Sequence, residues 1–307
     1  TAQTLLIIEK RSAVYSLVAL GRLFVGLSLN ISLVVILRWD LVGYFVSSFA
    51  TALFAAAVAI ILLVRRHPIR WDGEIARSLL AFQLPLVPGN IASLIGRQAE
   101  RIIVRYQLSL SQLGVLEMAY KFPTLIAMLI TVPFMRSWET TRMEIADHPG
   151  ARARIGSVFS YFTYIMLFGF LLLSVNIEAV LRILTPPEFW PAFFVARIEA
   201  AQMVIKGVTR HLGFGLFYAK RTKDMAKIMG VIAFFKVGLS YVMISTWGLY
   251  GAAWSALLAA IVSLVWMTRL ANRHYRFDVN WRKITVLVLA AAGTNVFIDS
   301  FSPAELA

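Results

Sequence analysis

The sequence contains no cysteine, and only 4 of its 307 residues are histidine. Without cysteine the protein can form neither disulfide bonds nor thiolate metal sites. The histidines show no metal-ligand spacing, and no Asp-x-Asp pair is present to hold a divalent cation. We therefore expect no metal and no cofactor.

The sequence also lacks the motifs of nucleotide-dependent and hydrolytic enzymes. There is no glycine-rich loop that could bind phosphate, because residues 213–215 supply only the fragment Gly-Phe-Gly. No grouping of a nucleophile with a base and an acid can be recognised. We therefore expect that the protein is not an enzyme.

Apolar residues, in contrast, make up 59% of the sequence. Runs long enough to cross a hydrocarbon core, about 20 residues for about 30 Å, recur along its whole length. This pattern predicts an all-α polytopic membrane protein with about nine membrane-spanning helices. The predicted spans are residues 13–37, 41–64, 79–105, 114–135, 155–175, 192–218, 228–246, 249–267 and 284–298.

Basic residues outnumber acidic residues by 30 to 16, which gives a formal net charge of +14. If the first span begins in the cytoplasm, the cytoplasmic connections contain nineteen basic residues, and the opposite side contains only Arg38 and Arg182. This is the distribution that sets membrane topology, so most of the charge is explained without a nucleic-acid partner. The nineteen residues are Lys10, Arg11, Arg65, Arg66, Arg70, Arg77, Arg136, Arg142, Arg152, Arg154, Lys220, Arg221, Lys223, Lys227, Arg269, Arg273, Arg276, Arg282 and Lys283.

Residues 65–82 interrupt the series of spans with a basic and then amphipathic stretch. A helix along the cytoplasmic interface would have this composition, and an ordinary cytoplasmic loop would fit it equally well. We place a boundary between two helical bundles here. The predicted domains are the last helices of an N-terminal lobe (1–65), an amphipathic linker between the lobes (66–78), a six-helix C-terminal lobe (79–275) and an additional C-terminal membrane helix (276–307).

Some charges lie within the predicted spans, where a charge at mid-bilayer costs about 3 kcal/mol. Lys206 and Lys236 lie near the middle of their spans, whereas Arg105 and Arg197 lie close to the outer surface, where a long side chain reaches water. The embedded basic residues are Arg22, Arg97, Arg101, Arg105, Lys121, Arg197, Lys206, Arg210 and Lys236, and the embedded acids are Glu100, Glu117 and Glu199.

Helical spacing places several of these charges on common faces. One stripe consists of Glu199, Gln202, Lys206 and Arg210, and the other of Arg97, Arg101 and Arg105. Glu117 and Lys121 are four residues apart and are expected to neutralise each other. The stripes predict a water-filled cationic cavity that binds an anion, and phosphate suits arginine especially. Polar bonds that only join the helices are the alternative.

We select the cavity residues by depth and spacing. The predicted substrate-binding residues are Arg22, Arg97, Arg101, Lys121, Lys206, Arg210 and Lys236, and the candidate ion-pair or coupling residues are Glu100, Glu117 and Glu199. We predict no catalytic residue and no metal ligand.

Residues 79–138 contain several short motifs in a characteristic order. Leu-Pro-Leu-Val-Pro at 84–88 is followed by the acidic-Arg pair at 100–101, by Gly114, and by Ala-Tyr-Lys at 119–121. This order resembles the seventh and eighth helices of Wzx-type O-antigen and exopolysaccharide flippases. That family belongs to the MATE-like multidrug/oligosaccharidyl-lipid/polysaccharide (MOP) exporter superfamily. Glu100 replaces the family's usual Asp, and Leu116 replaces its usual Tyr.

Two later stretches extend the resemblance over nearly the whole chain. The glycines and alanines of 248–253 resemble the start of the family's twelfth helix, and 184–192 resembles the periplasmic connection after the ninth. The resemblance implies a MATE-like two-lobe bundle, in which the first two spans are helices five and six and the next six spans form the second lobe. It also implies that the sequence is a fragment without the four preceding helices.

The resemblance implies translocation of an undecaprenyl-pyrophosphate-linked oligosaccharide from the cytoplasmic to the periplasmic leaflet by alternating access. Such a protein would lie in the bacterial inner membrane and serve the biosynthesis of surface polysaccharide, such as lipopolysaccharide. The expected partners are the lipid-linked oligosaccharide, the bilayer, and a polysaccharide polymerase with other assembly proteins. No nucleic acid is expected.

Three other functions remain open. A lipid II flippase would share the anionic lipid carrier. A cation-coupled multidrug antiporter would want acidic groups in its cavity, whereas basic residues predominate within these spans. A membrane glycan polymerase or ligase usually has sizeable periplasmic loops, and the longest outer connection predicted here is only 176–191.

Overall fold

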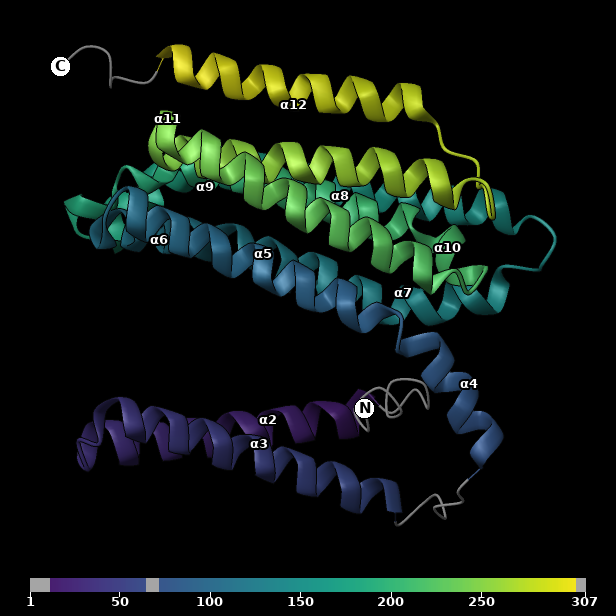
Figure 1. Cartoon of the computed structure of the whole chain (residues 1–307), viewed down its shortest axis with the longest axis horizontal. Helices are drawn as coiled ribbons and strands as arrows, with labels where there is room; N and C mark the ends of the chain where they lie inside the picture. Colours follow the sequence, from purple (N-terminus) through teal and green to yellow (C-terminus); the bar gives the residue numbers. More distant parts are fainter. Residues whose placement is uncertain (1–11, 65–71, 302–307) are drawn as a thin grey trace. The chain divides into compact units, whose positions relative to one another are not determined.

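The computed structural model describes residues 12–64 and 72–301, and these residues form helices without any strand (Figure 1). The predicted all-α fold is confirmed. The chain divides into two compact units, Thr1–Ala76 and Arg77–Ala307. Residues 65–71, which include the first part of the predicted linker (66–78), lie outside the described residues, and the domain boundaries stay a prediction.

The first unit contains a helical hairpin. Helix α2, Ser12–Asn30, continues into a π-helical turn, Ile31–Ile36, and α3 follows at Asp40–Val64. The two helices pack against each other, and Asn30 Nδ2 donates a hydrogen bond to Ser47 Oγ at 3.2 Å. This bond satisfies polar groups in a largely apolar helix pair.

The second unit is a larger helical bundle, and the division of the chain between Ala76 and Arg77 falls within α4. Its helices are the end of α4 (Gly73–Gln83) followed by α5 (Leu86–Gln107), α6 (Leu110–Ile126), α7 (Val132–Ile145), α8 (Ala151–Leu184), α9 (Ala192–Leu212), α10 (Phe214–Tyr218), α11 (Thr222–Ala271) and α12 (Trp281–Phe301).

Helix α11 is two antiparallel arms joined at Gly248. This glycine has φ 58° and ψ −135°, a conformation outside the helical region that a residue with a Cβ rarely adopts. The hydroxyl groups of Ser240 and Ser255, one on each arm, lie 2.8 Å apart. The predicted break between the seventh and eighth spans is therefore confirmed.

Helices α6 and α7 form one long rod with a π-helical turn, Ala127–Thr131, between them. Pro123 lies inside α6 and Pro133 lies in the first turn of α7. Proline cannot donate a backbone hydrogen bond, so helices change their winding near it. The rod continues to Ile145, ten residues beyond the predicted end of the fourth span at 135.

Five helical ranges within the described residues are long and apolar enough to cross a membrane. They are Asp40–Val58, Gly73–Gln107, Leu110–Ile145, Ala151–Leu184 and Thr222–Ala271. The last range has 50 residues and contains both arms of α11, so its length suffices for two crossings. The protein is thus a multi-pass membrane protein, and the total of nine spans stays a prediction.

Small residues bring α5 and α11 close together. A Cβ atom on Gly89 would lie 2.9 Å from the Cα atom of Ala226, and one on Gly96 would lie 3.5 Å from the Cβ of Ala233. Close packing through small residues is the usual way in which membrane helices associate. It places the charged face of α5 beside α11, where the site lies.

Candidate functional site

A cavity of about 550 Å³ lies within the second unit, between α5, α7, α9 and α11. Five cationic side chains from these four helices line it, and Glu139 is the acid among its described lining residues. The cations are Arg97, Arg142, Lys206, Arg210 and Lys236. The cavity is therefore electropositive, in a bundle whose helices are largely apolar.

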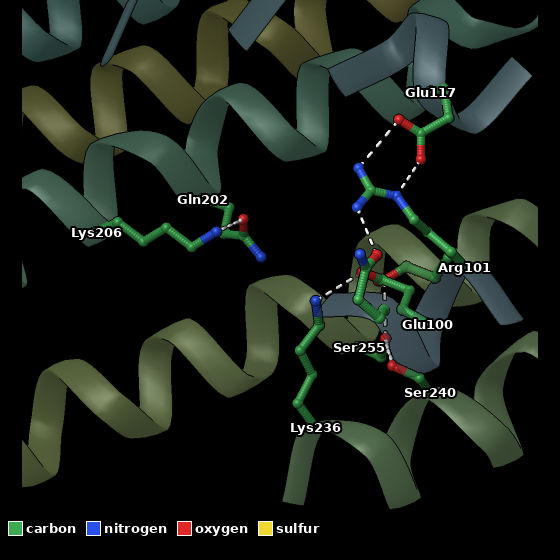
Figure 2. A network of polar contacts seen from close by, with 10 residues as sticks. Glu100, Arg101, Glu117, Gln202, Lys206, Lys236, Ser240 and Ser255 are labelled. Carbon is green, nitrogen blue, oxygen red and sulfur yellow. Dashed lines mark hydrogen bonds and ion pairs between the residues drawn. The ribbon is translucent and has the colours of Figure 1, made fainter. Parts of the chain in front are cut away.

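Helix α9 supplies one wall through residues four positions apart. Gln202, Lys206 and Arg210 all line the cavity, as their spacing predicts. Each step of four residues turns the helix by only about 40° from a full turn, so three such residues stay on one side. Lys206 Nζ donates a hydrogen bond to Gln202 Oε1, which orients the ammonium group (Figure 2).

Helix α11 supplies the apolar wall and one cation. Met229, Ile232 and Ala233 of its first arm line the cavity together with Lys236. Lys236 Nζ lies 2.7 Å from Oε2 of Glu100 on α5 (Figure 2). The side chains of Lys236 and Glu100 are only 16% and 3% exposed, so this ion pair is nearly dry.

Helix α7 places a second group of charges in the lining. Glu139 Oε1 lies 2.8 Å from Arg210 Nε and 3.9 Å from Arg142 Nη2. Arg142 is buried, and its Nη1 donates a hydrogen bond to the backbone oxygen of His211 at 3.3 Å. We call Glu139, Arg142 and Arg210 the Glu139 cluster.

Four of the seven predicted substrate-binding residues meet in this cavity, namely Arg97, Lys206, Arg210 and Lys236. The other three do not line it. Arg101 and Lys121 lie elsewhere in the second unit, and Arg22 is an exposed residue of α2 in the first unit. Whether any of these residues binds substrate stays a prediction.

The adjacent residues of the acidic-Arg motif, Glu100 and Arg101, bind different partners. Successive residues on a helix point about 100° apart, so the two side chains leave α5 in different directions. Glu100 faces Lys236 of α11, whereas Arg101 faces α6 and binds Glu117 (Figure 2). Arg101 Nη1 also donates a hydrogen bond to Gln98 Oε1 at 2.8 Å.

The expected pair of Glu117 with Lys121 is wrong. Both carboxylate oxygens of Glu117 accept from Arg101, and Lys121 is exposed, without an ion-pair partner among the described residues. A bidentate arginine fork binds a carboxylate better than a single ammonium group does. The candidate coupling residue Glu117 is thus held by a neighbouring helix.

Arg197 does not reach the outer surface as expected. Its side chain is buried, Nε donates a hydrogen bond to the backbone oxygen of Ser174 at 3.0 Å, and its guanidinium lies 5.2 Å from the ring centre of Phe193. Arg197 therefore joins α9 to α8. The prediction that Arg197 reaches water at the surface rested only on its depth in the span. Depth does not reveal which face of a helix packs against another helix.

The two buried acids beside the cavity have unused acceptors. Oε1 of Glu100 and Oε1 of Glu199 have no hydrogen-bond partner among the described residues. Glu199 precedes Gln202 on α9 and is fully enclosed by protein. Neither residue is among the cavity-lining residues, so both carboxylates reduce the positive charge of the lining without occupying the cavity.

Sequence reasoning missed Glu139 and Arg142, which it assigned to a cytoplasmic connection. A usable signal was present, because no helix-breaking residue occurs between Pro133 and the Pro-Gly at 149–150. An uninterrupted helix would have carried Glu139 and Arg142 onto one face, three residues apart.

The helices define a multi-pass membrane protein with a cationic cavity inside its larger bundle. Residues 10–137 match the model of a family described as "Polysaccharide biosynthesis protein". No curated protein and no solved structure matches the chain. The match confirms the resemblance to a polysaccharide biosynthesis family over residues 10–137. The MATE-like superfamily stays a prediction.

Proposed function

We propose that the protein is a flippase that moves an undecaprenyl-pyrophosphate-linked oligosaccharide from the cytoplasmic to the periplasmic leaflet of the bacterial inner membrane. The observation that carries this proposal is the cavity of about 550 Å³ with its five cationic side chains. A pyrophosphate cannot cross hydrocarbon without compensating charge, because removing an ion from water is very costly. The match to a polysaccharide biosynthesis family supports a glycan as the group carried on the lipid.

The lining suits both parts of such a head group. Arg97, Lys206 and Lys236 come from three different helices, so they can surround one anion from several sides. Arginine offers two parallel hydrogen bonds to phosphate oxygens, and lysine adds a mobile point charge. Met225 and Met229 of α11 offer flexible apolar surface to the first prenyl carbons next to the pyrophosphate.

Alternating access would carry the bound head group across the membrane, with two lobes rocking about a central site. Basic connections on the cytoplasmic side would attract the anionic lipid before it enters the cavity. Polysaccharide polymerases and other assembly proteins would then receive the glycan on the periplasmic side.

The cavity argues against a cation-coupled drug antiporter. A cationic drug would need exposed carboxylates, but Glu100 is bound to Lys236, and Glu139 is the acid among the described lining residues. A lipid II flippase would use the same pyrophosphate contacts, because the two substrates share the anionic carrier. The glycan bound would distinguish these two flippases.

Two substitutions within the cavity test the proposal. We expect Lys206→Gln to abolish surface polysaccharide while the protein remains in the membrane at its normal level. Lys236→Gln should do the same when it is combined with Glu100→Gln, which removes the buried carboxylate that would otherwise lose its counter-ion. Lys223→Gln is the matched control, since this exposed lysine of α11 is not among the cavity-lining residues. Surface polysaccharide is measured on gels, and protein level by immunoblot, in cells that depend on the gene. Normal polysaccharide in both cavity variants would contradict the proposal.

A reconstituted assay separates transport from synthesis. Vesicles that contain the protein and a labelled lipid-linked oligosaccharide should move the label between leaflets, and the Lys206→Gln protein should not. Equal movement with both proteins would show that the cavity charge is not needed for translocation.

A further inference from the structure

The Glu139 cluster contains a strongly fixed cation. The side chain of Arg142 is only 5% exposed, and its guanidinium lies 4.7 Å from the ring centre of Phe214. Nη1 is bonded to the His211 carbonyl, but Nε has no hydrogen-bond partner among the described residues. Arg142 is therefore a fixed cation that lines the cavity and has one unsatisfied donor.

Its nearest acid compensates this charge only in part. Glu139 Oε1 is 3.9 Å from Arg142 Nη2, beyond hydrogen-bonding distance, and lies much closer to Arg210, at 2.8 Å. A buried cation is stabilised by an anion that binds it directly. The cluster thus leaves Arg142 without its best partner.

The bond between Glu139 and Arg210 is exchangeable. Their side chains are 39% and 51% exposed, and both line the cavity. An ion pair in such a wet position contributes little to stability. A phosphate group brings more acceptor oxygens than a carboxylate and could bind both arginines at once.

We propose that Glu139 is an internal counter-ion that competes with the anionic ligand for Arg210 and Arg142. The ligand phosphate displaces the Glu139 carboxylate, and the two arginines then form a second phosphate subsite. This inference rests on the proposed function and adds to it a residue that sets affinity. Release is favoured by the same exchange, because Glu139 can return to Arg210 as the phosphate leaves.

The first phosphate subsite consists of Arg97, Lys206 and Lys236, and the second subsite adjoins it along α9. Lys206 and Arg210 are separated by four residues, a rise of about 6 Å along the helix. Their long side chains can therefore reach neighbouring phosphoryl groups of one ligand. A pyrophosphate head group would use both subsites, whereas a single phosphate would use one.

The experiment measures binding of inorganic pyrophosphate to the whole chain in nanodiscs by calorimetry. Glu139→Gln keeps the size of the side chain and removes its charge, so pyrophosphate should bind about fivefold more tightly. Glu139→Ala, which removes the carboxylate entirely, should also tighten binding. The control is Glu178→Gln, because Glu178 pairs with Arg182 on α8, 2.9 Å away and outside the lining residues.

A double-mutant cycle shows whether the gain depends on Arg210. In the Arg210→Gln background, Glu139→Gln should no longer tighten binding to the same degree, because the competition has been removed. A full fivefold gain in that background would overturn the inference. So would unchanged or weaker binding after Glu139→Gln alone, since Glu139 would then only position the arginines.

The source of the phosphate is tested with farnesyl pyrophosphate and uncharged farnesol. Glu139→Gln should tighten the binding of farnesyl pyrophosphate as it does that of free pyrophosphate, and leave farnesol unchanged. If Glu139→Gln tightened the binding of farnesol as much as that of farnesyl pyrophosphate, the inference would be overturned. Pyrophosphate binding that Lys206→Gln and Lys236→Gln do not weaken would instead contradict the proposed function, so the two failures can be distinguished.

Discussion

The ammonium group of Lys236 lies 2.7 Å from a carboxylate oxygen of Glu100, and this ion pair joins α11 to α5 at the edge of the cavity. The carboxylate is the more deeply buried partner, and its second oxygen has no hydrogen-bond partner in the described part of the chain. A dry ion pair stabilises a fold only weakly, because both charges have lost their water. Mutation can therefore separate the effect of this ion pair on protein stability from the effect of Lys236 on export.

Lys236→Met should lower the free energy of unfolding by about 3 kcal/mol, because it leaves the buried Glu100 carboxylate without a counter-ion. The double variant Lys236→Met with Glu100→Gln should recover most of that loss, since no buried charge remains. Polysaccharide export should stay absent in both. Thermal unfolding in detergent and the export assay measure the two effects. Export restored in the double variant would show that the ligand does not need Lys236.

Arg101 should matter much less than Arg97, although both belong to one predicted stripe. Arg101 and Glu117 are each 39% exposed, so Arg101→Gln should change the free energy of unfolding by less than about 1 kcal/mol. Export should continue, because Arg101 is not among the cavity-lining residues.

Arg97→Gln is the matched comparison, one turn earlier on the same helix. Arg97 lines the cavity and has no ion-pair partner among the described residues, so its loss should reduce export strongly with little change in unfolding. Surface polysaccharide and thermal unfolding are measured side by side for both arginine variants. If Arg101→Gln were the more severe, the ligand would have to contact α6.

The arginine stripe shows how far spacing can predict a site. Positions four apart drift by about 40° per step, so Arg97, Arg101 and Arg105 point progressively away from one another. The sequence predicted that these charges share a broad face of α5. It could not predict that Arg97 lines the cavity beside α11 whereas Arg101 faces α6, because the neighbour of each side chain depends on tertiary packing.

Breaks and cations on long apolar helices were easier to predict than helix ends. Gly248 follows a tryptophan between two apolar runs, so the break in α11 could be read from local sequence. Lys206 and Lys236 stood out because charge is costly in apolar surroundings. Arg142 did not, because hydropathy falls near residue 135 while the helix continues to Ile145.

Gly248→Ala should destabilise the protein by about 1–3 kcal/mol, because alanine is strained at a φ of 58°. Gly238→Ala on the same helix is the control. Gly238 has open space around it and no unusual φ, so alanine there should stabilise by up to about 1 kcal/mol. Thermal unfolding of both variants is the measurement. A neutral Gly248→Ala would contradict the hairpin geometry of α11.

The contact between α5 and α11 supports a last prediction about cavity shape. A Cβ on Gly89 would lie 2.9 Å from the Cα and 3.1 Å from the carbonyl oxygen of Ala226, and backbone atoms cannot move aside as a side chain can. Gly89→Ala should therefore separate the helices and cost about 2 kcal/mol of unfolding free energy.

That separation should also weaken pyrophosphate binding, because Arg97 of α5 and Lys236 of α11 would move apart. Gly230→Ala tests the same substitution on α11 where a Cβ meets nothing within 4 Å, and it should leave binding unchanged. Calorimetric binding and thermal unfolding are measured for both. If Gly89→Ala lowered stability but bound pyrophosphate normally, the cations would hold the anion without a fixed distance between α5 and α11.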